Sequence, residues 1–126
     1  MKVIIADRDS KTTQHIDRSL KAKIPEVSLL ATDSGQESLG IVRKSSTSLV
    51  IIGSELCDMS GFELIKRIRH FSEVPILFLS NDNSNTEIVK AYSMGIDRFI
   101  SKPIRQPMFV AYVMSLLTRV ANTNPM

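Results

Sequence analysis

Short apolar runs alternate along the chain with longer segments in which apolar residues recur every three or four positions. Each run has four or five residues bounded by turn-forming residues, a pattern typical of strands buried on both faces of a sheet. The second run is less regular, so we expect its strand to lie nearer an edge. The expected strands cover residues 3–6, 27–31, 49–52, 76–79 and 98–101.

The intervening segments carry apolar residues at helical spacing, and each begins with residues that can start a helix. Ser10 can cap the first helix, which Pro25 stops; Asp9 is the alternative cap, or else faces solvent. The later helices are expected to open at Asp33 to Gly35, at Ser60 or Gly61, at Asn85 and at Gln106-Pro107. Regular alternation of strand and helix predicts an α/β fold, with a five-stranded parallel sheet flanked by five helices.

Composition narrows the picture moderately. The chain has 126 residues, 43% of them hydrophobic, which suits one domain with a substantial core. We expect that domain to cover residues 1–121, with 122–126 as a tail or the start of a linker. The net charge of +3 is spread along the chain and is no nucleic-acid signature by itself.

The sequence also bears on location. It has no run of about 18 apolar residues, so we expect no membrane span. The start reads as a first strand and not as a signal peptide, because no small-residue cleavage region follows. The single cysteine, Cys57, excludes an internal disulfide and suits a reducing cytoplasm; we expect it to be buried and inert.

Polar or small residues mark the ends of four expected strands. Asp7, Gly53, Ser80 and Lys102 fall at or just past the ends of the first, third, fourth and fifth strands. Because the carboxyl ends of parallel strands meet at one edge of a sheet, we expect these residues to share a pocket.

That ordered set, with Pro103 after Lys102, resembles the receiver domain of bacterial response regulators in two-component systems. The resemblance covers essentially the whole chain. It implies a flavodoxin-like receiver fold, (βα)5, and a signalling module in place of an enzyme, with no catalytic residue and no cofactor.

The family's active site is only partly kept. In the family, two acidic residues and the phosphoacceptor aspartate hold Mg²⁺, while a hydroxyl and a lysine bind the phosphoryl oxygens. Asp7 matches the first acidic residue, but Arg8 stands in the second acidic position and Gly53 in that of the phosphoacceptor. The switch hydroxyl, the lysine and the switch aromatic are matched by Ser80, Lys102 and Phe99.

These departures predict a receiver without phosphorylation chemistry. Gly53 offers no nucleophile, and a pocket with two carboxylates lost and a guanidinium gained should repel Mg²⁺. We therefore expect no metal site and an atypical pseudo-receiver. Asp58 as a displaced phosphoacceptor is disfavoured by its reach.

Lys102 would then lack its usual partner, and a buried cation without a counter-charge is costly. We expect Asp7 and Glu55 to face the pocket and to neutralise Lys102 and Arg8. The alternative is that Arg8 extends into solvent.

The resemblance also implies an output face. In receivers of OmpR/PhoB-type transcription regulators, the fourth helix, fifth strand and fifth helix form a symmetric dimer. We expect Val89, Tyr92 and Val110 at the apolar centre of that face. The family's ion-pair positions fall on Ile88 with Met108, Arg98 with Tyr112, and Asp97 with Arg119, of which the last pair keeps opposite charges.

The last helix is apolar nearly all round from Met108 to Val120, which predicts burial on more than one side and hence a partner. The alternative is a wide core stripe with methionines on the surface.

The favoured function is a phosphorylation-independent module for signalling and dimerisation. It would control a DNA-binding output in transcription regulation through an effector domain not present in this chain. The alternative is a module that binds a small anion or metabolite through Arg8, Ser80 and Lys102. A third interpretation, an unrelated enzyme of flavodoxin-like fold, is not supported, because the sequence contains no glycine-rich phosphate loop, catalytic triad or metal cluster. His15 and His70 are isolated in the sequence, and we expect them on exposed helix faces.

Overall fold

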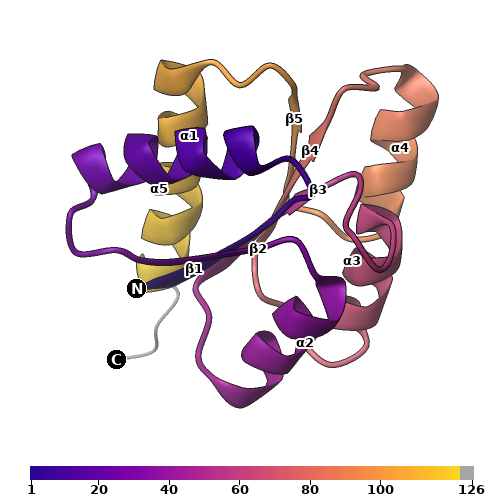
Figure 1. Cartoon of the computed structure of the whole chain (residues 1–126), viewed down its shortest axis with the longest axis horizontal. Helices are drawn as coiled ribbons and strands as arrows, with labels where there is room; N and C mark the ends of the chain where they lie inside the picture. The colour runs from indigo at the N-terminus through magenta and orange to yellow at the C-terminus, as the bar shows by residue number, and fades with distance from the viewer. Residues whose placement is uncertain (123–126) are drawn as a thin grey trace.

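Five parallel strands form one sheet in the order β2-β1-β3-β4-β5, with helices on both faces (Figure 1). This computed structural model describes the fold of residues 1–122 and the side chains of residues 1–118. The strands are β1 (Lys2–Ala6), β2 (Ser28–Thr32), β3 (Leu49–Gly53), β4 (Ile76–Ser80) and β5 (Arg98–Ser101). The helices are α1 (Ser10–Lys23), α2 (Gly35–Lys44), α3 (Gly61–Arg69), α4 (Asn85–Ser93) and α5 (Gln106–Asn122).

The predicted α/β fold is confirmed, and so is the edge position of the second strand. β2 and β5 are the edge strands and are partly exposed, whereas β3 and β4 are buried along their whole length. The expected domain end at residue 121 stays a prediction. The expected tail at 122–126 lies almost entirely outside the described residues.

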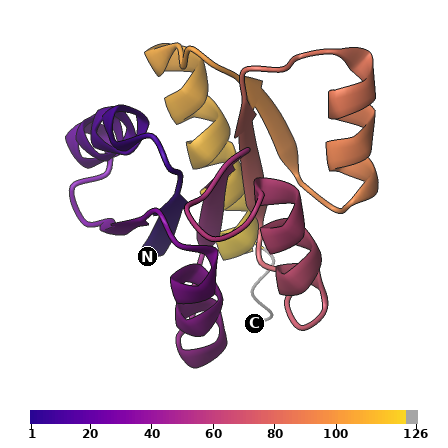
Figure 2. The same cartoon turned by 45° about the vertical axis from the view of Figure 1, so that its right-hand side comes forward.

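Alternating residues of the strands feed two separate cores. Val3 and Ile5 of β1 point to one face, where α1 and α5 pack, and Ile4 and Ala6 point to the other, where α2, α3 and α4 pack. Figure 2 shows α2, α3 and α4 at a distance from α1. Strands buried on both faces explain why their sequence runs are continuously apolar.

Side-chain oxygens begin four of the five helices. Ser34, Ser60 and Ser84 each accept a hydrogen bond from the backbone N–H three residues on, which satisfies an otherwise unpaired donor. The expected cap at Ser10 is wrong by one residue. Asp9 is the cap of α1 and accepts from the Lys11 N–H at 3.0 Å.

The last helix is explained mostly by a wide core stripe. Its buried residues, Phe109, Val110, Val113, Leu116 and Leu117, pack on the sheet beside α1. Met108 and Met114 remain exposed among the described side chains. The outer side of α5 therefore does not need to be covered along its whole length. A partner would have to cover only the exposed methionines and the residues next to them.

Close packing at Gly61 fixes the loop between β3 and α3. The Gly61 N–H donates to the Ser54 carbonyl at 2.9 Å. A Cβ at position 61 would overlap the carbonyl oxygen of Gly53 and lie 2.9 Å from the Phe78 ring. Backbone cannot yield as a flexible side chain can, so this loop tolerates only glycine at its closing residue.

We expect Gly61→Ala to lower the free energy of unfolding by about 1–3 kcal/mol, as overpacking commonly does. Gly40→Ala is the matched control, because Gly40 lies within α2 and its Cβ would meet nothing within 4 Å. That change should stabilise the protein by about 0.5–1 kcal/mol through helix propensity. Urea unfolding of both variants measures the difference, and equal effects would contradict the packing argument.

Candidate functional site at the carboxyl ends of the strands

The sheet brings together the four residues expected to share a pocket. Asp7 follows β1, Gly53 ends β3, Ser80 ends β4 and Lys102 follows β5. The Lys102 N–H donates to the Ser80 carbonyl at 2.9 Å, which ties the last two strand ends together.

Asp7 is the electrostatic centre of this pocket. Its Oδ1 accepts a hydrogen bond from the Asp9 N–H at 2.9 Å, and its Oδ2 lies 2.9 Å from Lys102 Nζ. The second contact is an ion pair whose alignment falls short of a hydrogen bond. The side chains of Asp7 and Lys102 are only 3% and 13% exposed, so both charges depend on each other.

The carboxylate of Asp7 also occupies the space that a side chain at position 53 would enter. A Cβ built on Gly53 would overlap Asp7 Oδ2 and its carboxyl carbon. Any larger residue there would force Asp7 to turn away and to weaken its contact with Lys102. Sequence reasoning did not find this dependence, since it compared each position separately.

Arg8 and Glu55 pair with each other at the rim. Arg8 Nη1 lies 3.9 Å from Glu55 Oε2, and their side chains are 68% and 76% exposed. The predicted pairing is present, and Arg8 also extends into solvent, as the alternative stated; the expectation that Glu55 faces the pocket is wrong. An exposed pair of this length contributes little to stability, and the Arg8 N–H to Glu55 carbonyl bond of 3.0 Å is the firmer link between the two loops.

The residues present do not fit the Mg²⁺ site of the family. Both oxygens of Asp7 already have partners, one of them a cation, and Glu55 turns to Arg8 in solvent. Among the described residues, no group of three histidine, cysteine or acidic side chains could hold a metal ion. A dication would have to displace Lys102 to reach a single carboxylate.

The two residues at the family's switch positions, Ser80 and Phe99, both form contacts within the domain. Ser80 is buried; its Oγ accepts from the Asp82 N–H at 3.0 Å and donates to Glu87 Oε2 at 3.3 Å. Phe99 is half-buried and packs on Phe78 with ring centroids 5.9 Å apart. Its N–H donates to the Tyr92 hydroxyl at 3.1 Å.

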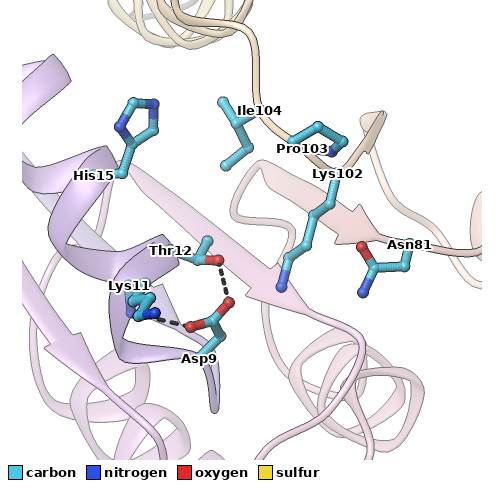
Figure 3. Close-up of a pocket in the computed structure, with 8 residues that line it drawn as sticks. All are labelled: Asp9, Lys11, Thr12, His15, Asn81, Lys102, Pro103 and Ile104. Carbon is cyan, nitrogen blue, oxygen red and sulfur yellow. Dashed lines mark hydrogen bonds between the residues drawn. The ribbon is translucent and has the colours of Figure 1, made fainter.

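A hollow of about 440 Å³ opens beside Lys102, between the start of α1 and the loop that follows β5 (Figure 3). Asp9 lies in its wall and accepts from the Thr12 hydroxyl at 2.9 Å, the main cause that lowers the pKa of this carboxyl. Neither Arg8 nor Ser80 lines the hollow, so the three residues expected to bind an anion do not converge there. The lining residues are Asp9, Lys11, Thr12, His15, Asn81, Lys102, Pro103 and Ile104.

Sequence reasoning assigned no role to Thr12 or Asn81 and placed His15 on an exposed face. His15 is half-buried, whereas His70 is exposed as expected. The one signal available was the spacing of Asp9 and Thr12, which suits a capped helix start.

Asp58 serves as a second cap of α2. Its carboxylate accepts from the Gln36 N–H at 3.0 Å, the Gly35 N–H at 2.7 Å and the Ser34 hydroxyl at 2.9 Å. The hydrogen bonds from Gln36 and Gly35 are the main causes that lower its pKa. Asp58 is therefore bound to the start of α2, which adds a second reason, besides its reach, against a displaced phosphoacceptor.

Cys57 is exposed, so the expectation that it is buried is wrong. Partial desolvation, followed by the nearby Asp33 carboxylate, raises the pKa of its thiol. A raised pKa lowers the fraction of thiolate, the reactive form of the side chain.

The expected dimer face divides into exposed and buried parts. Val89, Tyr92 and Met108 are exposed, and Ile88 is half-buried beside them. The expectation that Val110 lies at the centre of this face is wrong, because Val110 is 9% exposed and packs in the core against the sheet.

The charged positions of that face have partners within the chain. The Arg98 guanidinium lies 3.8 Å from the centroid of the Tyr112 ring of its own chain. Asp97 Oδ2 lies 3.4 Å from Arg69 Nη2 and accepts from the Ile76 N–H at 2.8 Å. The side chain of Arg119, the expected partner of Asp97, lies outside the described side chains.

Comparison with known proteins identifies the class. The family description of the response regulator receiver domain matches residues 3–114, so the chain belongs to that family. No helix within the described part of the chain has the length and apolar character that crossing a membrane requires.

The relatives are regulators. The sensory transduction protein BceR of Halalkalibacterium halodurans is 40% identical over 74 residues, which cover 59% of this chain and 32% of BceR. The transcriptional regulatory protein YvrH of Bacillus subtilis is 27% identical over 117 residues, which cover 93% of this chain and 49% of YvrH. A two-component response regulator from Clostridium difficile has a TM-score of 0.86 at 26% identity, covering 94% and 97% of the two chains. The chain thus spans about half or less of these curated relatives.

We expect Asp7→Asn to lower the free energy of unfolding by about 3 kcal/mol, because it leaves the Lys102 ammonium buried without a counter-charge. Asparagine keeps the acceptor for the Asp9 N–H, so the change isolates the charge. Adding Lys102→Met should recover part of that loss, since no unpaired charge remains. Urea unfolding measures each variant.

Glu55→Gln is the matched control, because it removes the carboxylate of the exposed pair with Arg8. Its cost should stay below about 1 kcal/mol. A cost for Asp7→Asn no larger than that of the control would refute the dependence of Lys102 on Asp7.

Proposed function

We propose that this chain is a receiver domain that works without phosphorylation, as a signalling and dimerisation module in transcription regulation. The observation that carries the proposal is the position of the Asp7 carboxylate. It fills the space beside Gly53 and binds Lys102, so the charge that would receive a phosphoryl group is already neutralised.

Two further features support a fixed state of the domain. The hydroxyl of Ser80 is engaged by the start of α4, and Phe99 packs inward on Phe78. Neither arrangement needs a phosphoryl group. The output would therefore be set by protein concentration or by a partner, and not by a kinase.

The output itself is proposed from the relatives. YvrH is described as a transcriptional regulatory protein, and CtrA of Caulobacter vibrioides, 27% identical over 94% of this chain, as a cell cycle transcriptional regulator. We assign DNA binding to an effector domain that is not present in this chain and place the protein in the cytoplasm. The module would extend over residues 1–121.

Binding of a small anion in the pocket, the alternative function, has less support. Lys102 is engaged by Asp7, Arg8 reaches the rim, and the Ser80 hydroxyl has both a donor and an acceptor partner. An anion would have to displace Asp7 before it could reach Lys102.

Incubation with acetyl phosphate and Mg²⁺ should leave the mass of the protein unchanged, with no gain of about 80 Da for a phosphoryl group. The reason is that Gly53 offers no nucleophile and Asp7 is bound to Lys102. Intact-mass spectrometry makes the measurement. A stoichiometric, Mg²⁺-dependent adduct would defeat the proposal.

The matched comparison is the double variant Arg8→Asp with Gly53→Asp, which supplies the missing carboxylates. We expect it to bind Mg²⁺ with millimolar affinity by calorimetry, once Asp7 turns away from position 53. Failure to bind would mean that Asp7 and Lys102 hold the pocket closed even against two added carboxylates.

Dimerisation is proposed through the exposed part of α4 and α5. Val89 is 66% exposed, and Met108 and Tyr92 are exposed as well on the expected dimer face. Apolar side chains in these positions can be buried by a second copy without an activating charge, and such anchors dominate interfaces.

We expect Val89→Glu or Met108→Glu to convert a dimer into a folded monomer, as measured by sedimentation velocity at high micromolar concentration. Met114→Glu is the matched control, since Met114 is an exposed methionine of the same helix that lines a hollow with Met1 and Ile24. It should leave the dimer intact. A monomeric parent protein would remove the hypothesis, and dissociation by the control alone would move the interface.

A further inference from the structure

The ends of α2 and α3 place a group of cations side by side. Each helix carries an acidic residue in its first turn and basic residues in its last turn. The two helices pack against each other, so their basic ends adjoin (Figure 1, Figure 2). We call this group the basic face; its residues are Arg43, Lys44, Lys66, Arg67, Arg69 and His70.

Two neighbouring hollows make the basic face continuous. One, of about 450 Å³, lies between α2 and α3 and is lined by Arg43, Arg67 and His70. The other, of about 320 Å³, is lined by Lys66, Arg69 and the same His70. No acidic side chain is among the described residues that line either hollow.

Most of this charge is not neutralised within the chain. Arg67 is paired with Glu63 at 2.8 Å, and Arg69 with Asp97 at 3.4 Å. Arg43, Lys44 and Lys66 are exposed and lie within 4.0 Å of no acidic group among the described residues.

The helix dipole explains why cations collect at a helix end, but not why Arg43, Lys44 and Lys66 of two adjoining ends form no ion pair among the described residues. The last turn of α1 offers a contrast. It also carries two lysines, Lys21 and Lys23, yet it lies on the opposite face of the sheet and Lys21 is paired with Asp17 at 3.3 Å.

We propose that the basic face binds the phosphate backbone of duplex DNA, independently of base sequence. This contact lies within the receiver domain itself, beyond the DNA binding assigned above to a separate effector domain. It would hold the receiver against DNA that such a domain engages and would steer the approach of the protein to DNA.

The surface fits phosphate better than an acidic protein. Protein interfaces depend on apolar or aromatic anchors at their centre. One aromatic ring lies beside the basic face, that of Phe71, which is 39% exposed. The Arg43 guanidinium stacks on this ring, 4.7 Å from its centroid. Phosphate binding needs only accessible Arg and Lys side chains, which the basic face provides.

The test uses this chain and a fluorescein-labelled 20-base-pair duplex of mixed sequence, followed by fluorescence anisotropy at several salt concentrations. We expect a dissociation constant of about 1–100 µM at physiological salt, the range of non-specific binding, and tighter binding at lower salt. The variant Arg43→Gln with Lys66→Gln should weaken binding about tenfold and reduce the salt slope by about 2, one unit for each lost phosphate contact.

Lys21→Gln with Lys23→Gln is the matched control, with the same loss of charge from the end of another helix. It should change the affinity less than about twofold, and circular dichroism should show both variants folded. Absence of binding by the parent protein, or equal losses in the two variants, would overturn the proposal. Binding to polyglutamate without binding to the duplex would overturn it as well and would assign the face to an acidic protein. Because none of these measurements involves phosphodonors or dimerisation, they fail or succeed independently of the proposed function.

Discussion

The ion pair between Asp7 and Lys102 is the interaction on which the site depends. Both side chains are almost removed from water, and either charge alone would be costly there. The two opposite charges are paired with each other, so a charged ligand would have to displace one of them to reach the other.

Gly53 and Gly61 make this arrangement possible. Without a side chain at position 53, the Asp7 carboxylate can lean into the space beside β3 and reach Lys102. Without one at position 61, α3 can begin against the carbonyl of Gly53 and fix the backbone that surrounds the carboxylate. The space beside the Gly53 Cα is therefore filled by the Asp7 carboxylate.

The fold was predictable because it follows from periodicity. Continuous apolar runs and helical spacing report which faces are buried, and they located β1 to β5 to within about a residue. Contacts between helices, strands and loops were harder to predict from the sequence. Val110 was expected on the dimer face from the resemblance to OmpR/PhoB-type receivers, but packing decides which side of the helix faces the sheet, and Val110 lies in the core. Cys57 was expected to be buried because cysteine usually is, but its loop carries it outside.

Helix direction gives the domain its distribution of charge. All five helices run from the carboxyl ends of the strands back to the amino ends, so every helix N-terminus lies on the side of the pocket. Acidic residues favour N-termini and basic residues favour C-termini, and α2, α3 and α4 follow that rule with Glu37, Glu63 and Glu87 in their first turns. The pocket end is thus the acidic end, where caps and ion pairs use up the carboxylates. The opposite end carries the basic last turns of α2 and α3, where Arg43, Lys44 and Lys66 are exposed.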